Sequence, residues 1–254
     1  MTTHKKSKRL SIDISVIAVV FIALVVFYIA GRIHNEHEKN ASNLAKTSIN
    51  KQRYSINNPT SIWVVVNKQR PLSTIGFVPS TLITPSVSIN RISNILPTSL
   101  QPIAAQAIDS MFMSAKTNNI YLALTSAYVP YTFQQGVYDG YLATQGQAAA
   151  DANTIRPGYD ESQVGLSADL AAANKKCVNQ ICFSTTPEGK WLIANAYKFG
   201  FTLRYPSGKQ NITGFNYEPW HYRYVGIDLA TQLNTNNQTL EQFFNLSPAP
   251  NYKE

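Results

Sequence analysis

The sequence has few of the residues that bind metals or carry charge. Among its 254 residues there are two cysteines and four histidines, and charged residues make up 14%. Two cysteines exclude a disulfide-rich scaffold and a four-cysteine zinc site. Apolar residues make up 44%, so the composition is also unlike that of a charge-rich disordered chain. The sequence therefore predicts one folded domain of ordinary size, or two small ones.

The net charge of +8 is concentrated at the N-terminus. Residues 1–53 hold nine basic and three acidic residues, and residues 54–254 hold the remaining 13 and 11. The larger part of the chain is therefore close to neutral. A nucleic-acid-binding domain carries its positive charge on the folded part, so this distribution argues against one.

An uncharged apolar run follows the basic N-terminus. The 18 residues from Ile14 to Gly31 would extend roughly 27 Å as a helix, close to the thickness of a bilayer's hydrocarbon core. The run lacks the small residues of a cleavage site at its end, which favours an uncleaved anchor over a signal peptide. We therefore expect a cytoplasmic tail (1–10), a transmembrane helix (11–31) and a stalk (32–58), with the domain outside the membrane.

Residues 59–254 form one unit in which helices come early and strands late, an order that predicts an α+β fold. We expect helices, from apolar spacing and capping residues, over 102–116, 132–144, 185–199 and 240–244. We expect strands, from β-branched and aromatic residues, over 62–66, 120–125, 166–170, 201–205 and a last segment ending near residue 224. A capping box of Thr185 and Glu188 should begin the third helix, and Gly200 should end it.

The two cysteines, Cys177 and Cys182, lie close together in the sequence. Outside the cytoplasm such a pair favours a small loop-closing disulfide. Free thiols and half of a zinc site are the alternatives. The chain has no further cysteine that could complete such a zinc site.

Three polar residues in the second half of the domain are candidates for chemistry. Asp169 falls in an apolar strand, where a buried carboxylate needs a partner. Glu218 and His221 lie beside a tryptophan and a proline. A strand-borne aspartate with a glutamate and a histidine indicates metal binding or acid–base chemistry.

Two other interpretations of these residues stay open. One is a structural salt bridge from an acidic residue of this set to Arg204 or Arg223. The other is a Ser-His-Asp triad with His221 as base, which no G-x-S-x-G motif supports. The remaining histidines are His4 in the tail and His34 and His37 in the stalk, so the outer domain contributes one imidazole.

Several blocks of sequence, taken in order, resemble the VanY-type D-alanyl-D-alanine carboxypeptidases. The blocks are 63–68, 126–131 with 134–135, 146–151, 156–158, 189–192, 200–201, 204–209, 212–214 and 217–226. The resemblance covers residues 62–245, nearly all of the outer domain. It implies an α+β zinc peptidase fold in a bacterial protein that removes the C-terminal D-alanine from peptidoglycan stem peptides.

The resemblance also implies a role for each candidate residue. Family members hold zinc with the His and Asp of S-x-H-x-x-G-x-A-x-D and the His of E-x-W-H, whose Glu is the general base. Three protein ligands leave a fourth position for a water, and zinc lowers the pKa of that water. By position, Asp169 and His221 match two ligands and Glu218 matches the base. Tyr128, Gln135 and Tyr159 are expected to bind substrate, with core packing as the alternative.

The sequence departs from the family pattern at the site itself. Ser162 stands at the first zinc-binding histidine, and a neutral hydroxyl is a poor zinc ligand. Asp160 replaces the motif's leading serine, and Val129 replaces an arginine expected to stabilise substrate or an oxyanion. Asp160 or Glu161 is a weak substitute for the lost ligand. We therefore expect zinc binding, and hydrolysis with it, to be weakened.

Two functions are consistent with this pattern. In the first, the protein is a membrane-anchored metallocarboxypeptidase with weakened activity on stem peptides. In the second, it is a catalytically inactive pseudoenzyme that binds cell-wall peptides or a protein partner through the former catalytic cleft. Either way, the expected location is the outer face of a bacterial cytoplasmic membrane.

Overall fold

The computed structural model describes residues 49–91 and 97–253. The predicted tail, the predicted transmembrane helix and most of the predicted stalk lie outside these residues, as do His4, His34 and His37. Within the two described ranges, no helix combines the length and the apolar character needed to cross a bilayer.

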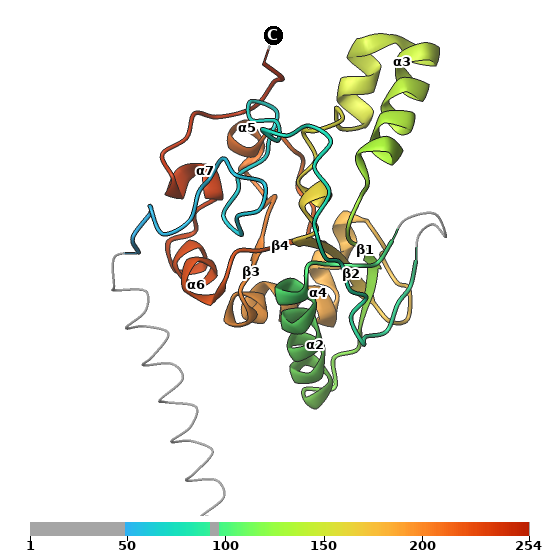
Figure 1. The fold of residues 1–254 in the computed structure, drawn as a ribbon. Coiled ribbons are helices and arrows are strands. Elements are labelled where there is room, and N and C mark those ends of the chain that lie inside the picture. The colour runs from blue at the N-terminus through green and yellow to red at the C-terminus, as the bar shows by residue number, and fades with distance from the viewer. Residues whose placement is uncertain (1–48, 92–96, 254) are drawn as a thin grey trace, which may run out of the picture. The chain divides into compact units, whose positions relative to one another are not determined.

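A four-stranded sheet with the order β1-β2-β4-β3 forms the centre of the domain (Figure 1). Each strand is antiparallel to its neighbour. The strands are β1 (Leu122–Ser126), β2 (Ser167–Ala172), β3 (Phe201–Leu203) and β4 (His221–Tyr224). Because β2 and β4 are the two central strands, residues on them are enclosed from both sides.

Helices surround this sheet, and α3 projects from the body of the domain (Figure 1). The α-helices are α2 (Pro102–Thr117), α3 (Tyr131–Asn153), α4 (Pro187–Asn195), α5 (Gln210–Thr213), α6 (Ile227–Asn236) and α7 (Leu240–Phe243). Short 3₁₀-helices are η1 (Glu161–Val164), η2 (Ile181–Thr185) and η3 (Ala196–Phe199). An antiparallel sheet with separate helices is the α+β class that the sequence predicts.

The segment after residue 62 is buried, but the strand predicted over 62–66 is wrong. Its side chains alternate between two core clusters, which explains the strand-like pattern. Its carbonyl groups instead accept hydrogen bonds from arginine side chains. Arg223 Nη2 donates to the carbonyl of Val64 at 3.1 Å, and Arg204 Nη2 donates to that of Val66 at 3.3 Å. The partners of these carbonyl groups are therefore side chains that local sequence does not reveal.

The end of the predicted stalk is part of the folded domain. The ring of Tyr54 packs edge-on against Trp63, with centroids 4.9 Å apart. The carbonyl of Ile56 accepts a hydrogen bond from the N–H of Val65 at 3.1 Å. Because Ile49 and Ile56 also pack on the second core cluster, apolar burial holds this segment against the domain.

A disulfide between Cys177 and Cys182 closes the loop between β2 and η2. Cys177 packs against the first core cluster. Phe183, directly after the second cysteine, is fully buried. The loop is therefore fixed to the core near both ends of the disulfide.

The third predicted helix exists, but its first residue differs from the prediction. Thr186, not Thr185, is the N-cap of α4, and its hydroxyl accepts a hydrogen bond from the N–H of Gly189 at 3.0 Å. Pro187 occupies the first helical turn, as expected. Gly200 ends the following 3₁₀ turn with a φ of 84°, a left-handed conformation that favours glycine.

We expect Thr186→Ala to lower the free energy of unfolding by about 1 kcal/mol, because the first turn of α4 loses its capping acceptor. Chemical denaturation of the full-length protein measures this change. Thr185→Ala is the matched control and should change stability by less than about 0.5 kcal/mol. Equal effects of the two substitutions would contradict the assigned cap.

Candidate active site

The sheet places Asp169 directly opposite His221. The two residues are register partners on β2 and β4, so their side chains lie on the same face. Imidazole Nδ1 is 2.8 Å from Asp169 Oδ1. A register shift between Leu124 and Ser126 interrupts β1 beside this pair, and the Thr125 hydroxyl donates to the carbonyl of Asp169 at 3.0 Å. Such irregularities are common next to functional sites because they redirect side chains.

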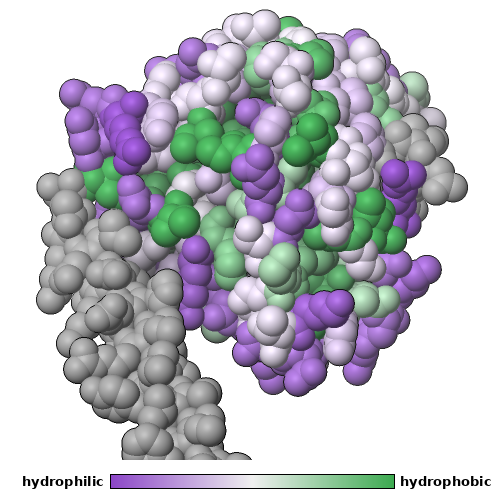
Figure 2. Space-filling model, turned by 60° about the horizontal axis from the view of Figure 1, so that its bottom comes forward, coloured by the Kyte–Doolittle hydropathy of each residue, from purple (hydrophilic) through white to green (hydrophobic). Residues whose placement is uncertain are grey.

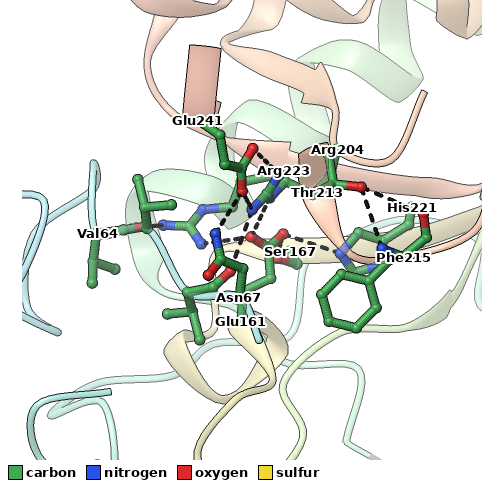
Figure 3. Close-up of polar contacts among 12 residues, drawn as sticks. Val64, Asn67, Glu161, Ser167, Arg204, Thr213, Phe215, His221, Arg223 and Glu241 are labelled. Atoms are coloured by element: carbon green, nitrogen blue, oxygen red, sulfur yellow. Dashed lines mark hydrogen bonds and ion pairs between the residues drawn. The ribbon is translucent and has the colours of Figure 1, made fainter. Parts of the chain in front are cut away.

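The second ring nitrogen of His221 lies next to Glu161, a residue of η1. Imidazole Nε2 is 3.1 Å from Glu161 Oε1, which also accepts a hydrogen bond from the Ser167 hydroxyl at 2.9 Å. The other oxygen, Oε2, accepts from Arg204 Nε at 2.7 Å and from Arg223 Nη1 at 3.4 Å. Figure 3 shows these side chains meeting around one carboxylate.

The charge of Glu161 is balanced although the side chain is fully buried. Burial on its own would raise the pKa of this carboxyl, because it disfavours the charged form. Arg204, Arg223 and His221 together hold the pKa well below its usual range. Glu161 is therefore a fixed carboxylate at any physiological pH.

The network continues into the C-terminal part of the domain (Figure 3). Arg204 Nη2 contacts Glu241 Oε1 at 2.7 Å, and the Asn67 amide donates to the same oxygen at 2.9 Å. Glu241 lies in α7, which begins with a capping box formed by Thr239 and Gln242. The buried charges therefore connect the sheet, η1 and α7.

The alternative salt bridge from Asp169 or Glu218 to an arginine is wrong. Both Arg204 and Arg223 form ion pairs with Glu161. Asp169 instead pairs with His221. Sequence reasoning treated Glu161 only as a substitute ligand. The one available signal was that two arginines in an apolar domain need buried acidic partners.

His221 is held by two carboxylates at once. Burial would lower the pKa of the imidazole, but the contacts with Asp169 and Glu161 raise it well above its ordinary value. Both contacts therefore favour the charged form of the ring, in which each nitrogen carries a proton. It also stacks on Tyr205, with centroids 5.0 Å apart, and Tyr205 in turn contacts Phe215.

Two further acidic residues, Glu218 and Asp160, lie close to His221. Burial raises the pKa of the Glu218 carboxyl to about 7, against the effect of His221, and Asp169 and Asp160 add to the rise. Burial likewise raises the pKa of Asp160, whose carboxylate accepts a hydrogen bond from the N–H of Ser162 at 2.8 Å. The site is therefore rich in carboxyl groups and contains one imidazole.

The two main departures from the family pattern are neighbours in space. The N–H of Val129 donates to the carbonyl of Ser162 at 3.3 Å, and both residues are buried. In the part of the chain that the structure describes, no three side chains of His, Cys, Asp or Glu are arranged to hold a metal ion. The predicted ligands Asp169 and His221 are brought together, but they bind each other.

The residues predicted to bind substrate lie in different surroundings. Tyr128 is buried. Tyr159 is half-buried and packs edge-on against Tyr252, with centroids 5.2 Å apart. Gln135 is exposed on α3, whereas its neighbour Gln134 is buried and donates to the Thr154 hydroxyl at 3.0 Å. The second glutamine of the pair therefore faces solvent, while the first supports the fold.

We expect Glu161→Gln to destabilise the protein by about 3–5 kcal/mol, because two buried guanidinium groups lose their shared counter-charge. Chemical denaturation measures the loss. Asp139→Asn, an exposed acidic residue of α3, is the control and should change stability by less than about 0.5 kcal/mol. A Glu161→Gln cost below about 1 kcal/mol would show that the network is not structural.

We expect Glu218→Gln to stabilise the protein by about 1 kcal/mol at pH 8 and to have little effect at pH 5. The expected gain is small because the Glu218 side chain is partly exposed, and solvent screens its charge. The folded pKa of about 7 lies above the ordinary value of 4.5, so the native protein loses stability as the pH rises between these values. Unfolding curves at both pH values measure the difference. A benefit confined to pH 5 would contradict this assignment.

Known proteins are similar to this chain in sequence and in fold. The VanY family model, described as D-alanyl-D-alanine carboxypeptidase, matches residues 97–227. The YodJ protein of Bacillus subtilis (strain 168) is 37% identical over 190 residues, which cover 75% of this chain and 69% of YodJ.

Two solved structures are also similar. The LdcB LD-carboxypeptidase matches with a TM-score of 0.70 at 36% identity, over 74% of this chain and 88% of LdcB. A variant of the vancomycin resistance D,D-pentapeptidase VanY in complex with Zn(II) matches with a TM-score of 0.53 at 30% identity, over 72% of this chain and 98% of VanY. On this evidence, the chain belongs to the VanY D-alanyl-D-alanine carboxypeptidase family.

Proposed function

We propose that this family member binds peptidoglycan stem peptides in a site that has lost zinc-dependent hydrolysis. The observation that carries the proposal is the incomplete ligand set: in the part of the chain that the structure describes, Asp169 and His221 have no third side chain arranged with them to hold a metal ion. An imidazole binds zinc through the lone pair of a deprotonated nitrogen. In the described site each ring nitrogen faces a carboxylate oxygen, which favours a proton on that nitrogen.

The surrounding groups oppose a return to a zinc-binding arrangement. Glu161, fixed by two arginines, holds Nε2 of His221, so zinc could approach the ring only through Nδ1, which now faces Asp169. Zinc would then find Asp169 and one imidazole, with the Ser162 hydroxyl at the third position. Zinc sites in proteins use thiolate, imidazole or carboxylate ligands. The residues present therefore do not fit the metal.

Val129, which stands where the family has an arginine, also disfavours hydrolysis. An arginine at this position would bring a cation toward Ser162, since the two backbones are hydrogen-bonded. Fixed cations stabilise the negative charge that develops on a carbonyl oxygen during hydrolysis. Without zinc and without this cation, the site lacks two of the groups that the family pattern supplies for that charge.

The site keeps groups suited to binding a peptide. With a pKa of about 7, Glu218 is half protonated near neutral pH, so its carboxyl both donates and accepts hydrogen bonds. Tyr159, which is half-buried, offers aromatic surface with a polar end. We include membrane anchoring in the proposal. The apolar run before the stalk would hold the domain outside the cytoplasmic membrane, facing the wall.

We expect the full-length protein, equilibrated with zinc and then desalted, to retain far less than one zinc per chain. It should bind a stem pentapeptide by calorimetry but release no D-alanine above the blank. The double variant Ser162→His with Val129→Arg should gain both zinc and D-alanine release. Adding Glu218→Gln to the double variant should abolish the release without removing zinc, because the general base is lost.

Two other results would contradict the proposal. One zinc per chain in the unmodified protein, with D-alanine release that Glu218→Gln abolishes, would show an active metallocarboxypeptidase. Absence of both pentapeptide binding and release would show that the domain has another ligand.

A further inference from the structure

The described residues on the face shown in Figure 2 do not form a continuous apolar groove. In this view of the lower side of the domain, apolar side chains lie in separate patches with hydrophilic residues between them. Scattered apolar residues are ordinary on the surface of a folded domain. The unexplained feature of the domain is instead a cation at the edge of the candidate active site.

This cation is Lys68, whose side chain lies against two aromatic rings. Its Nζ is 5.5 Å from the ring centroid of Phe215 and 5.3 Å from that of Tyr252. Phe215 packs on Tyr205, which in turn stacks on His221, with centroids 4.7 and 5.0 Å apart. A row of rings therefore leads from His221 to the ammonium group of Lys68.

Tyr252 connects Lys68 with Tyr159, a residue predicted to bind substrate. The two tyrosine rings pack edge-on, and the Tyr252 hydroxyl accepts a hydrogen bond from the N–H of Arg156 at 2.9 Å. The next residue, Lys253, donates its backbone N–H to the carbonyl of Lys68 at 3.1 Å. Figure 1 shows this end of the chain beside α5. These contacts fix the backbone of Lys68, while its side chain remains partly exposed.

Within the described ranges, the ammonium group of Lys68 contacts the two rings but forms no ion pair. Asp151 attracts it, but Arg156 binds both oxygens of Asp151, at 2.8 and 2.7 Å. Burial lowers the pKa of the Lys68 amine by more than Asp151 raises it. A partly buried ammonium group in this situation is stabilised when an anion binds beside it.

The centre of the site has the opposite charge. Glu218 and Asp160 lie close to His221, so a second anion is disfavoured there. The arginines of the site do not offset this effect, because both are paired with Glu161. The site therefore has an acidic centre and a cationic edge, and a ligand that carries a carboxylate is favoured with that group at Lys68.

We propose that Lys68 binds a carboxylate group of the peptide at the edge of the site formed by Phe215 and Tyr252. This inference rests on the proposed function, since it requires a peptide in the site. Hydrogen bonds between an ammonium group and a carboxylate are stronger than those between neutral groups. Lys68 would therefore select peptides that carry a carboxylate at this point.

Calorimetric titration of the full-length protein tests the proposal, with the stem pentapeptide and with derivatives in which its carboxyl groups are amidated one at a time. We expect one amidation to weaken binding about tenfold or more. Lys68→Met should weaken binding of the original pentapeptide by a similar factor, and the same amidation should then cost no further affinity. Lys68→Arg, which keeps the charge, should remain sensitive to that amidation.

Lys253→Met is the matched control, because Lys253 is exposed and contacts Lys68 through its backbone. It should bind the pentapeptide as the unmodified protein does and stay sensitive to amidation. Burial already disfavours the charged form of Lys68, so Lys68→Met should not lower the melting temperature. A loss of binding in this variant would then not be a loss of fold.

Two results would overturn this inference and leave the proposed function intact. One is pentapeptide binding that no amidation weakens. The other is a Lys68→Met variant that is as sensitive to amidation as the unmodified protein. Absence of any pentapeptide binding to the unmodified protein would instead contradict the proposed function, and this inference with it.

Discussion

Glu161 is a carboxylate without contact with solvent, and side chains from two strands and from the end of a third converge on it. Taken alone, a charge in this position would be prohibitively unfavourable. Arg204, Arg223 and His221 compensate it, and Arg204 extends the network to Glu241 in α7. The two arginines also donate to the carbonyls of the buried segment around Val64. The arrangement of η1, the sheet and α7 therefore depends on one ion cluster.

The same cluster determines the chemistry of the site. Glu161 cannot move without breaking its ion pairs with the arginines. Its contact with His221 is therefore kept as long as the domain is folded. Asp169 holds the other nitrogen through the register of β2 and β4. His221, which matches a family zinc ligand, thus lies between two carboxylates that favour its charged form. No other imidazole is available in the domain to replace the histidine that the family has at position 162.

The sequence predicted some elements well because their determinants are local. Helix α2 follows from the proline at its start and from apolar spacing, and the turn at Gly200 follows from the need for a left-handed residue. The predicted strand over 62–66 failed because its carbonyl groups pair with side chains of distant residues. The pairing of Glu161 with arginines also depends on long-range packing, and no spacing in the sequence encodes it. Motif positions identified Asp169, Glu218 and His221, but they did not reveal which groups would bind His221.

The protonation of His221 tests this account most directly. Long-range ¹H–¹⁵N NMR of the full-length protein with ¹⁵N-labelled histidine reports whether each ring nitrogen carries a proton or a metal, and His221→Gln assigns the signals. At pH 7 we expect both nitrogens of His221 to be protonated, with shifts that do not change when Zn(II) is added. A nitrogen that loses its proton and moves to a metal-bound shift on addition of Zn(II) would contradict the account.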